Sequence, residues 1–145
     1  MNIIDHQLRG NDCGISAIKT VFNIFRKEIG RAYILDNVFV DEKGSSMSDI
    51  KKFFDDQGCK SIFKFLDVNG LSKDLNSLKG LFPFILPVKK TDELHYVVVN
   101  GIKRNKLRIF DPSRIAPYYL SLAELKTIAY YSDSYWELAD LKERM

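Results

Sequence analysis

Residues 7–14 read QLRGNDCG, a run of polar and small residues that ends in a cysteine and a glycine. From residue 13 to residue 29 apolar residues then recur at steps of three and four, which predicts a helix with one buried face. Gly30 is the expected end of that helix, because glycine is common just past a helix C-terminus. The stretch therefore predicts a loop that places one thiol, that of Cys13, at the start of a buried helix.

This position makes Cys13 a candidate nucleophile, because the unpaired amides and the dipole of a helix N-terminus favour a thiolate. Gln7 lies on the same loop and can turn its amide toward the point where a substrate carbonyl gains negative charge, beside the backbone N–H of Cys13. Asn11 or Asp12 is the expected helix cap. An ionised Asp12 opposes a neighbouring thiolate, so we expect its carboxylate to face backbone amides instead.

A cysteine at a helix start is often only a core residue, and catalysis also needs a base and a group that orients it. His95 begins a β-branched run that continues to Ile102, and Asp111 follows a second run over residues 107–110. The polar residues 103–106 suit the turn of an antiparallel hairpin. Such a hairpin brings His95 and Asp111 to the same end of adjacent strands, so nucleophile, base and orienting group are all present.

The remaining pattern places helices before strands. Residues 31–44 have poor periodicity and are expected to form a loop, and the charged tail from Asp140 to Met145 is expected to fray. The other expected elements are, in chain order, a serine-capped helix ending at Gln57, a strand over 59–68 with Cys59 in the core, a helix over 71–78, a strand at 84–86 between prolines that suit an edge, a weak strand at 118–119, a helix from Ser121 to about Ala129, and a last strand or edge cover among the aromatics of 130–136. The expected fold class is α+β, with N-terminal helices packed on a C-terminal antiparallel sheet.

At 145 residues the chain fits one domain, with a helical part over about 1–80 and a sheet part over about 81–138. A hydrophobic share of 46% and a charged share of 28% are typical of a compact globular protein. The formal charge of +3 comes from scattered residues, without the basic run that nucleic-acid binding favours. We therefore expect no nucleic-acid partner.

The two cysteines show no spacing typical of a zinc site, so we expect neither a metal nor a cofactor. Reduced thiols in a cytoplasmic setting are the simpler interpretation of two cysteines in a chain of this length. The N-terminus has no signal-peptide pattern, and no run of eighteen apolar residues is present. The sequence thus favours an intracellular enzyme that does not itself cross a membrane.

The ordered set of Gln7, Asp12-Cys13-Gly14, His95 and Asp111-Pro112 resembles the peptidase domain of bacteriocin-processing ABC transporters, peptidase family thirty-nine of the cysteine class. The resemblance extends from Gln7 to about Leu125. A cysteine and a histidine alone would be a weak signal, but the ordered set with its spacings is specific. Arg114 stands after Asp111-Pro112-Ser113, where the family often has a glycine, and this departure concerns the local turn and not the assignment of the aspartate.

The resemblance implies a papain-like fold, with Cys13 as nucleophile, His95 as base and acid, Asp111 orienting the imidazole and Gln7 in the oxyanion hole. It also implies a substrate, a peptide whose leader ends in two glycines and is removed as the cargo is exported. The implied partners are the membrane and ATPase domains of an ABC transporter outside this chain, which places the domain at the cytoplasmic face of the membrane. On this basis the chain is either an excised N-terminal domain or a stand-alone relative, and the residues that bind the substrate stay unidentified.

Three other interpretations remain open from the residues. A peptidase-like domain can dock export substrates without cutting them, a transglutaminase or acyltransferase can use the same triad, and Cys13 and His95 can be coincidental members of a structural module. His6 is a second histidine beside Gln7, but a base on the nucleophile's own loop would have to reach back over it. His95 is therefore the expected base.

Overall fold

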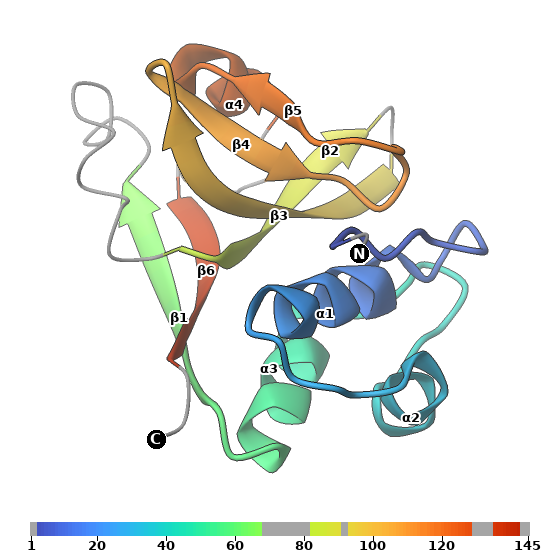
Figure 1. The fold of residues 1–145 in the computed structure, drawn as a ribbon. Coiled ribbons are helices and arrows are strands. Elements are labelled where there is room, and N and C mark those ends of the chain that lie inside the picture. Colours follow the sequence, from blue (N-terminus) through green and yellow to red (C-terminus); the bar gives the residue numbers. More distant parts are fainter. Residues whose placement is uncertain (1–2, 68–81, 91–92, 129–134, 143–145) are drawn as a thin grey trace.

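The computed structural model describes residues 3–67, 82–90, 93–128 and 135–142, and Figure 1 shows their arrangement. Three helices precede a four-stranded antiparallel sheet, and a two-stranded ribbon lies beside them. The elements are α1 (Cys13–Ile24), α2 (Arg31–Asn37), α3 (Met47–Asp56), β1 (Lys60–Asp67), β2 (Phe84–Lys90), β3 (Glu93–Lys103), β4 (Lys106–Phe110), β5 (Tyr118–Leu120), α4 (Leu122–Ile128) and β6 (Tyr135–Lys142). The expected α+β class, with N-terminal helices on a C-terminal antiparallel sheet, is confirmed.

Helix α1 is the central helix and lies between the sheet and α3 (Figure 1). It begins at Cys13 as expected, but it ends at Ile24, so the prediction that it continues to Gly30 is wrong. Arg26 has a φ of 59°, and the amide of Lys27 donates to the carbonyl of Phe22. A left-handed residue and this bond end the helix, although apolar side chains continue to recur beyond it.

Residues 31–37 form helix α2, so the prediction of a loop is wrong for this part of 31–44. Only Ile34 is buried in this short helix, while Tyr33 and Leu35 are exposed. A single buried position in seven residues produces no helical period, which explains why the pattern failed to indicate the helix. Packing against α1 therefore decides the conformation of this segment.

Helix α3 follows the prediction. The Ser46 hydroxyl accepts a hydrogen bond from the amide of Asp49 at 3.1 Å, and the Asp49 carboxylate accepts from the amide of Ser46 at 3.2 Å. This reciprocal capping box fixes the start of the helix. Its buried side chains, Met47, Ile50, Phe53 and Phe54, face α1 and the sheet.

The four-stranded sheet has the strand order β2-β3-β4-β5, with every neighbouring pair antiparallel. Strands β3 and β4 form the predicted hairpin, but its turn has two residues rather than four: Arg104 and Asn105, with φ values of 52° and 63°. Two successive positive φ angles are typical of the tight turns that match strand twist. Strand β2 continues to Lys90 through Pro87, which is tolerated because β2 is an edge strand of this sheet.

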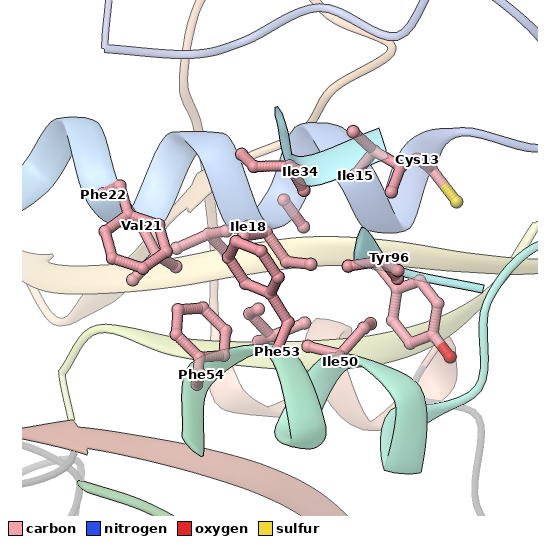
Figure 2. Close-up of a cluster of buried hydrophobic side chains, with 14 of the residues drawn as sticks. Cys13, Ile15, Ile18, Val21, Phe22, Ile34, Ile50, Phe53, Phe54 and Tyr96 are labelled. Carbon is pink, nitrogen blue, oxygen red and sulfur yellow. The ribbon is translucent and has the colours of Figure 1, made fainter. Parts of the chain in front are cut away.

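The sheet separates two apolar clusters. Ile85, Tyr96, Val98 and Phe110 face α1 and α3, while Phe84, Leu86, Val88, Val97, Val99, Leu107 and Ile109 face the opposite side with Leu125 of α4. Figure 2 shows the first cluster, in which Ile18 and Phe22 of α1 lie against Phe53 and Phe54 of α3. Alternating strand residues thus build both cores, and the sheet is buried on both faces.

Strand β1 confirms the prediction for 59–68, and it pairs antiparallel with β6. Cys59 precedes β1 and is partly buried against the first cluster. Because β6 extends to Lys142, the expected fraying of residues 140–142 is wrong. The helix predicted over 71–78 lies outside the described residues. Within the part of the chain that is described, no helix has the length and apolar character to traverse a membrane.

Candidate active site

Cys13 is the first residue of α1, and 5% of its surface is exposed. It lies at the end of the row of apolar side chains along this helix (Figure 2). The next residue, Gly14, is buried, and a Cβ there would lie in ordinary van der Waals contact, 3.4 Å from Ser45 and 3.5 Å from Tyr96. Neither Cys13 nor Cys59 forms a disulfide.

The Asp12 carboxylate organises the loop that leads to Cys13. It accepts hydrogen bonds from the amide of Leu8 at 3.2 Å and the amide of Arg9 at 3.1 Å, and it makes no side-chain cap to α1. The expectation that this carboxylate faces backbone amides is therefore confirmed. Asp12 occupies the N-cap position, as predicted, but its side chain does not cap α1, because the loop amides take its oxygen atoms.

Arg31, the first residue of α2, completes the environment of Asp12. Its Nη2 donates to Asp12 Oδ2 at 2.6 Å, and its Nη1 donates to Ser16 Oγ at 2.7 Å. Nη1 also forms an ion pair with Asp5. No sequence pattern singles out Arg31, because the residue is separated from Cys13 by a whole helix and lies in a segment without a motif.

The hairpin brings His95 and Asp111 together as predicted. Val98 of β3 pairs with Phe110 of β4, so that Asp111, one residue beyond β4, lies beside the first part of β3. His95 Nε2 lies 2.7 Å from Asp111 Oδ1, and both residues are buried. The Cys13 side chain lies near enough to the His95 ring to raise the pKa of the imidazole. Since Nε2 faces Asp111, Nδ1 is the nitrogen available to the thiol.

Asp111 has further partners that no sequence motif indicated. Its Oδ1 accepts from the amide of Ser113 at 2.9 Å and from the Ser113 hydroxyl at 2.7 Å, and its Oδ2 accepts from the Tyr118 hydroxyl at 3.1 Å. The Arg114 guanidinium stacks on the Tyr118 ring, 4.8 Å from its centroid. An aspartate that binds the amide two residues later is a common local turn, so Ser113 could have been found from the sequence. Tyr118 could not have been found in this way, because it reaches the Asp111 carboxylate only when the chain turns back and β5 pairs with β4.

These contacts stabilise a charged pair. Burial by itself lowers the pKa of His95, but the hydrogen bonds to Asp111 and Cys13 and the negative charges of these two residues outweigh it and raise the pKa to about 9. Burial likewise raises the pKa of Asp111, but the hydrogen bonds from His95 and Ser113 and the charge of His95 bring it well below its ordinary value. An imidazolium beside a carboxylate is thus the stable form near neutral pH.

Gln7 is attached to the site through its backbone. Its amide donates to the carbonyl of Pro112 at 3.1 Å, which joins the loop before Cys13 to the corner after Asp111. The side-chain Nε2 donates to the carbonyl of Arg9 at 3.1 Å, while Oε1 is buried without a hydrogen-bond partner. The Gln7 side chain therefore bonds within its own loop rather than to the triad.

The arrangement has a definite chemical capacity. A thiol, an imidazole and a carboxylate in this order can carry out nucleophilic acyl transfer, with the imidazole moving the proton. Among the described residues, no group of three or more histidine, cysteine, aspartate or glutamate side chains could hold a metal ion.

Solved structures with the same fold include a double glycine motif protease from an AMS/PCAT transporter in complex with the leader peptide. It is 18% identical, covers 94% of this chain and 90% of its own, and has a TM-score of 0.74. The peptidase domain of Streptococcus ComA, described as a bifunctional ABC transporter involved in quorum sensing, is 22% identical and covers 96% and 98%, with a TM-score of 0.76. The peptidase C39 like domain of a Vibrio parahaemolyticus toxin secretion ATP-binding protein is 12% identical and covers 92% and 100%, with a TM-score of 0.66.

At these identities the solved structures establish the fold, and the papain-like arrangement implied by the resemblance agrees with it. A comparison with curated protein sequences finds no match. The model of the Peptidase C39 family matches residues 2–132, which include the loop, the thiol, the histidine and the aspartate described above. The chain therefore belongs to the Peptidase C39 family.

Proposed function

We propose that this chain is a cysteine endopeptidase that removes the leader of export-bound peptides by cutting after a Gly-Gly pair. The observation that carries the proposal is the contact of one buried histidine with both Cys13 and Asp111, in a chain of the Peptidase C39 family. Family membership alone would not separate an active peptidase from a domain that has lost its chemistry. An intact nucleophile, base and orienting carboxylate support activity.

In the proposed reaction the Cys13 thiolate attacks the carbonyl carbon of the second glycine. His95, protonated when the thiolate forms, donates its proton to the leaving amine, so that the C–N bond breaks and a thioester remains. The neutral imidazole then takes a proton from water, whose oxygen attacks the thioester and regenerates the thiol. Asp111 holds the imidazole through Nε2 and leaves Nδ1 directed at the thiol.

Gln7 and the backbone amide of Cys13 are the proposed donors to the oxyanion. Gln7 Nε2 carries two N–H groups and donates one of them to the carbonyl of Arg9, so that one remains available. The bond between the Gln7 amide and Pro112 keeps this loop beside the Asp111 corner. A donor fixed in this way needs little reorganisation when charge develops on the substrate.

The substrate class and the setting are also proposals. A solved structure with the same fold is described as a double glycine motif protease in complex with the leader peptide, and another as the peptidase domain of an ABC transporter. By analogy we assign to this chain a double-glycine leader as substrate, and the membrane and ATPase domains of a transporter as partners, at the cytoplasmic face of the membrane. The proposed chemistry requires neither a metal nor a cofactor.

The test is incubation of the protein with synthetic leader peptides that end in Gly-Gly before a cargo segment, followed by mass spectrometry of the products. We expect one cut after the second glycine, no cut in a matched peptide with both glycines replaced by alanine, and no products with the Cys13→Ala variant. Intact Gly-Gly peptides after incubation with a folded protein that binds them would overturn the peptidase assignment.

Binding of Gly-Gly peptides without cleavage is the result that a second candidate function predicts. This candidate is a peptidase-like domain that docks export substrates without cutting them. One observation favours it: the Gln7 amide bonds to Arg9 in its own loop rather than to the thiol or the imidazole. The same incubation separates the candidates when binding and product formation are both measured.

A further inference from the structure

Arg31 links three parts of the molecule that meet beside the thiol. It extends from the first turn of α2 and contacts Asp5 of the N-terminal segment, Asp12 of the loop and Ser16 of α1. Its side chain is 21% exposed and that of Asp12 is 8% exposed, so the pair is largely withdrawn from water. A charge pair at this depth is much less screened by salt than one on the surface.

The position of Arg31 is not explained by the stability of its own helix. A cation in the first turn of a helix opposes the helix dipole, which favours anions there. The two carboxylates that Arg31 contacts belong to other segments, and one of them, that of Asp12, is adjacent to Cys13 in the chain. The stabilisation of Arg31 therefore comes from the N-terminal segment and the loop rather than from α2.

The Asp12 carboxylate has two effects on the site, and the charge of Arg31 offsets the unfavourable one. Its oxygen atoms hold the amides of Leu8 and Arg9 and so shape the loop before the nucleophile. The same negative charge, buried beside Cys13, opposes a thiolate. The guanidinium at 2.6 Å cancels that charge and leaves the loop hydrogen bonds intact.

We propose that Arg31 is a positioning residue of the site, whose ion pair with Asp12 lets one carboxylate shape the nucleophile loop without disfavouring the Cys13 thiolate. The inference rests on the proposed function in that it assigns Cys13 a nucleophilic role. Four charged or titratable groups surround Asp12 and Cys13. They are Arg31 from α2, Asp5 from the N-terminal segment, His95 from β3 and, behind His95, Asp111. The first two act on Asp12, and the last two act on Cys13 through the imidazole.

The test measures how fast iodoacetamide alkylates Cys13 as a function of pH, without any peptide, in a Cys59→Ala background so that one thiol reports. For Arg31→Met we expect the acid limb of this profile to move upward by about one pH unit, which makes alkylation about fivefold slower at the wild-type midpoint. At the alkaline plateau the rates should agree. Because no peptide is cut in this assay, the proposed peptidase activity can fail while the ion-pair inference stands, and the reverse.

A second charge change separates electrostatics from a purely structural role. Arg31→Met combined with Asp12→Asn removes both the carboxylate adjacent to Cys13 and its counter-charge, and only Asp5, whose side chain is 22% exposed, loses its partner. The acid limb should therefore return close to its wild-type position. Asp12→Asn alone leaves Arg31 with Asp5 as its one remaining carboxylate partner and should move the limb to lower pH. Arg31→Lys keeps the charge and should restore most of the wild-type profile.

Two matched controls accompany these variants, together with thermal unfolding curves that check folding. Asp5→Asn removes the other carboxylate on the same guanidinium and should move the limb much less than Arg31→Met does. Lys52→Met breaks an exposed ion pair on α3 and should leave the profile unchanged. The inference is overturned if a folded Arg31→Met protein has the wild-type acid limb, or if the double variant is shifted further than Arg31→Met. Should Arg31→Met not fold, the Asp12→Asn profile decides, and an unmoved limb there overturns the inference.

Discussion

The two sides of the candidate site are built in different ways. On the base side, His95 and Asp111 lie on neighbouring strands of one hairpin, and Ser113, two residues beyond Asp111, supports its carboxylate. On the nucleophile side, the loop before Cys13 is held by a buried carboxylate whose counter-charge comes from another helix.

The two sides differ in how far apart in the sequence their interacting residues lie. On the base side the register of one hairpin places His95 beside Asp111, so the geometry follows from local strand pairing. The nucleophile side depends on Arg31, which reaches Asp5, Asp12 and Ser16 only when α2 packs against α1. We therefore expect substitutions on the base side to affect mainly chemistry, and those around Asp12 to affect the state of the thiol.

The largest effect is expected at the nucleophile itself. Cys13→Ala should reduce leader cleavage by at least about ten thousandfold, because no other group can form the thioester. Product formation followed by mass spectrometry checks this. The matched control is Cys59→Ala, which removes the other cysteine and should leave the rate nearly intact. If a folded Cys59→Ala protein is inactive and Cys13→Ala is not, the nucleophile has been misassigned.

The next effect tests whether the base side acts as a unit. His95→Ala should lower kcat by about a thousandfold or more, and adding Asp111→Ala should change little further, because the carboxylate acts only through the imidazole. The measurement is kcat for the two single variants and the double variant. Independent action would appear as a double variant whose loss is the product of the two single losses.

Gln7 lies where the two sides meet and should show an intermediate effect. Its proposed hydrogen bond strengthens only as the oxyanion forms, so Gln7→Ala should lower kcat by about a hundredfold with little change in leader affinity. Calorimetric binding of an uncleavable leader, measured beside kcat for a cleavable one, checks this. Weaker binding with unchanged kcat would show that Gln7 belongs to the substrate groove instead.

The pH profile should distinguish the contribution of Asp111. His95 has a pKa raised to about 9, so the imidazolium is present below this value and is lost as pH rises through it. We expect kcat/KM to fall above about pH 9 in the wild type. In Asp111→Asn a major cause of the raised pKa is absent, so the fall should begin about one to two pH units lower. An unmoved alkaline limb would mean that another group sets it.

The smallest effect is expected for Tyr118, which donates one hydrogen bond to Asp111 Oδ2. Burial, the Asp111 charge and this bond raise the pKa of the Tyr118 hydroxyl above its ordinary value, so it remains a donor at working pH. Tyr118→Phe should lower kcat by about fivefold, which corresponds to roughly 1 kcal/mol for one hydrogen bond.

Ser113 still holds the other oxygen of Asp111 in that variant, which keeps the loss small. The control is Tyr119→Phe at the neighbouring, exposed position, which should have no effect on kcat. Equal losses in the two variants would assign the effect to strand β5 rather than to the Tyr118 hydroxyl.

Much of the fold could be predicted from the sequence because it rests on local signals. The start of α1, the serine-capped helix α3, the hairpin of β3 and β4 and the capping box of α4 each follow from period or from residues three positions apart. The pairing of His95 with Asp111 follows from the same hairpin.

The sequence by itself thus determined the α+β class and the residues that form the candidate triad, because short-range patterns specify helices, turns and register. Only the tertiary structure decided the helix at 31–37 and the contacts of Arg31 and Tyr118 beside the site. The physical reason is that an ion pair or a hydrogen bond between distant segments leaves no period in the sequence. Such contacts form only after the helices and the sheet have packed, and they then set the charge and the position of groups that the local pattern had already placed.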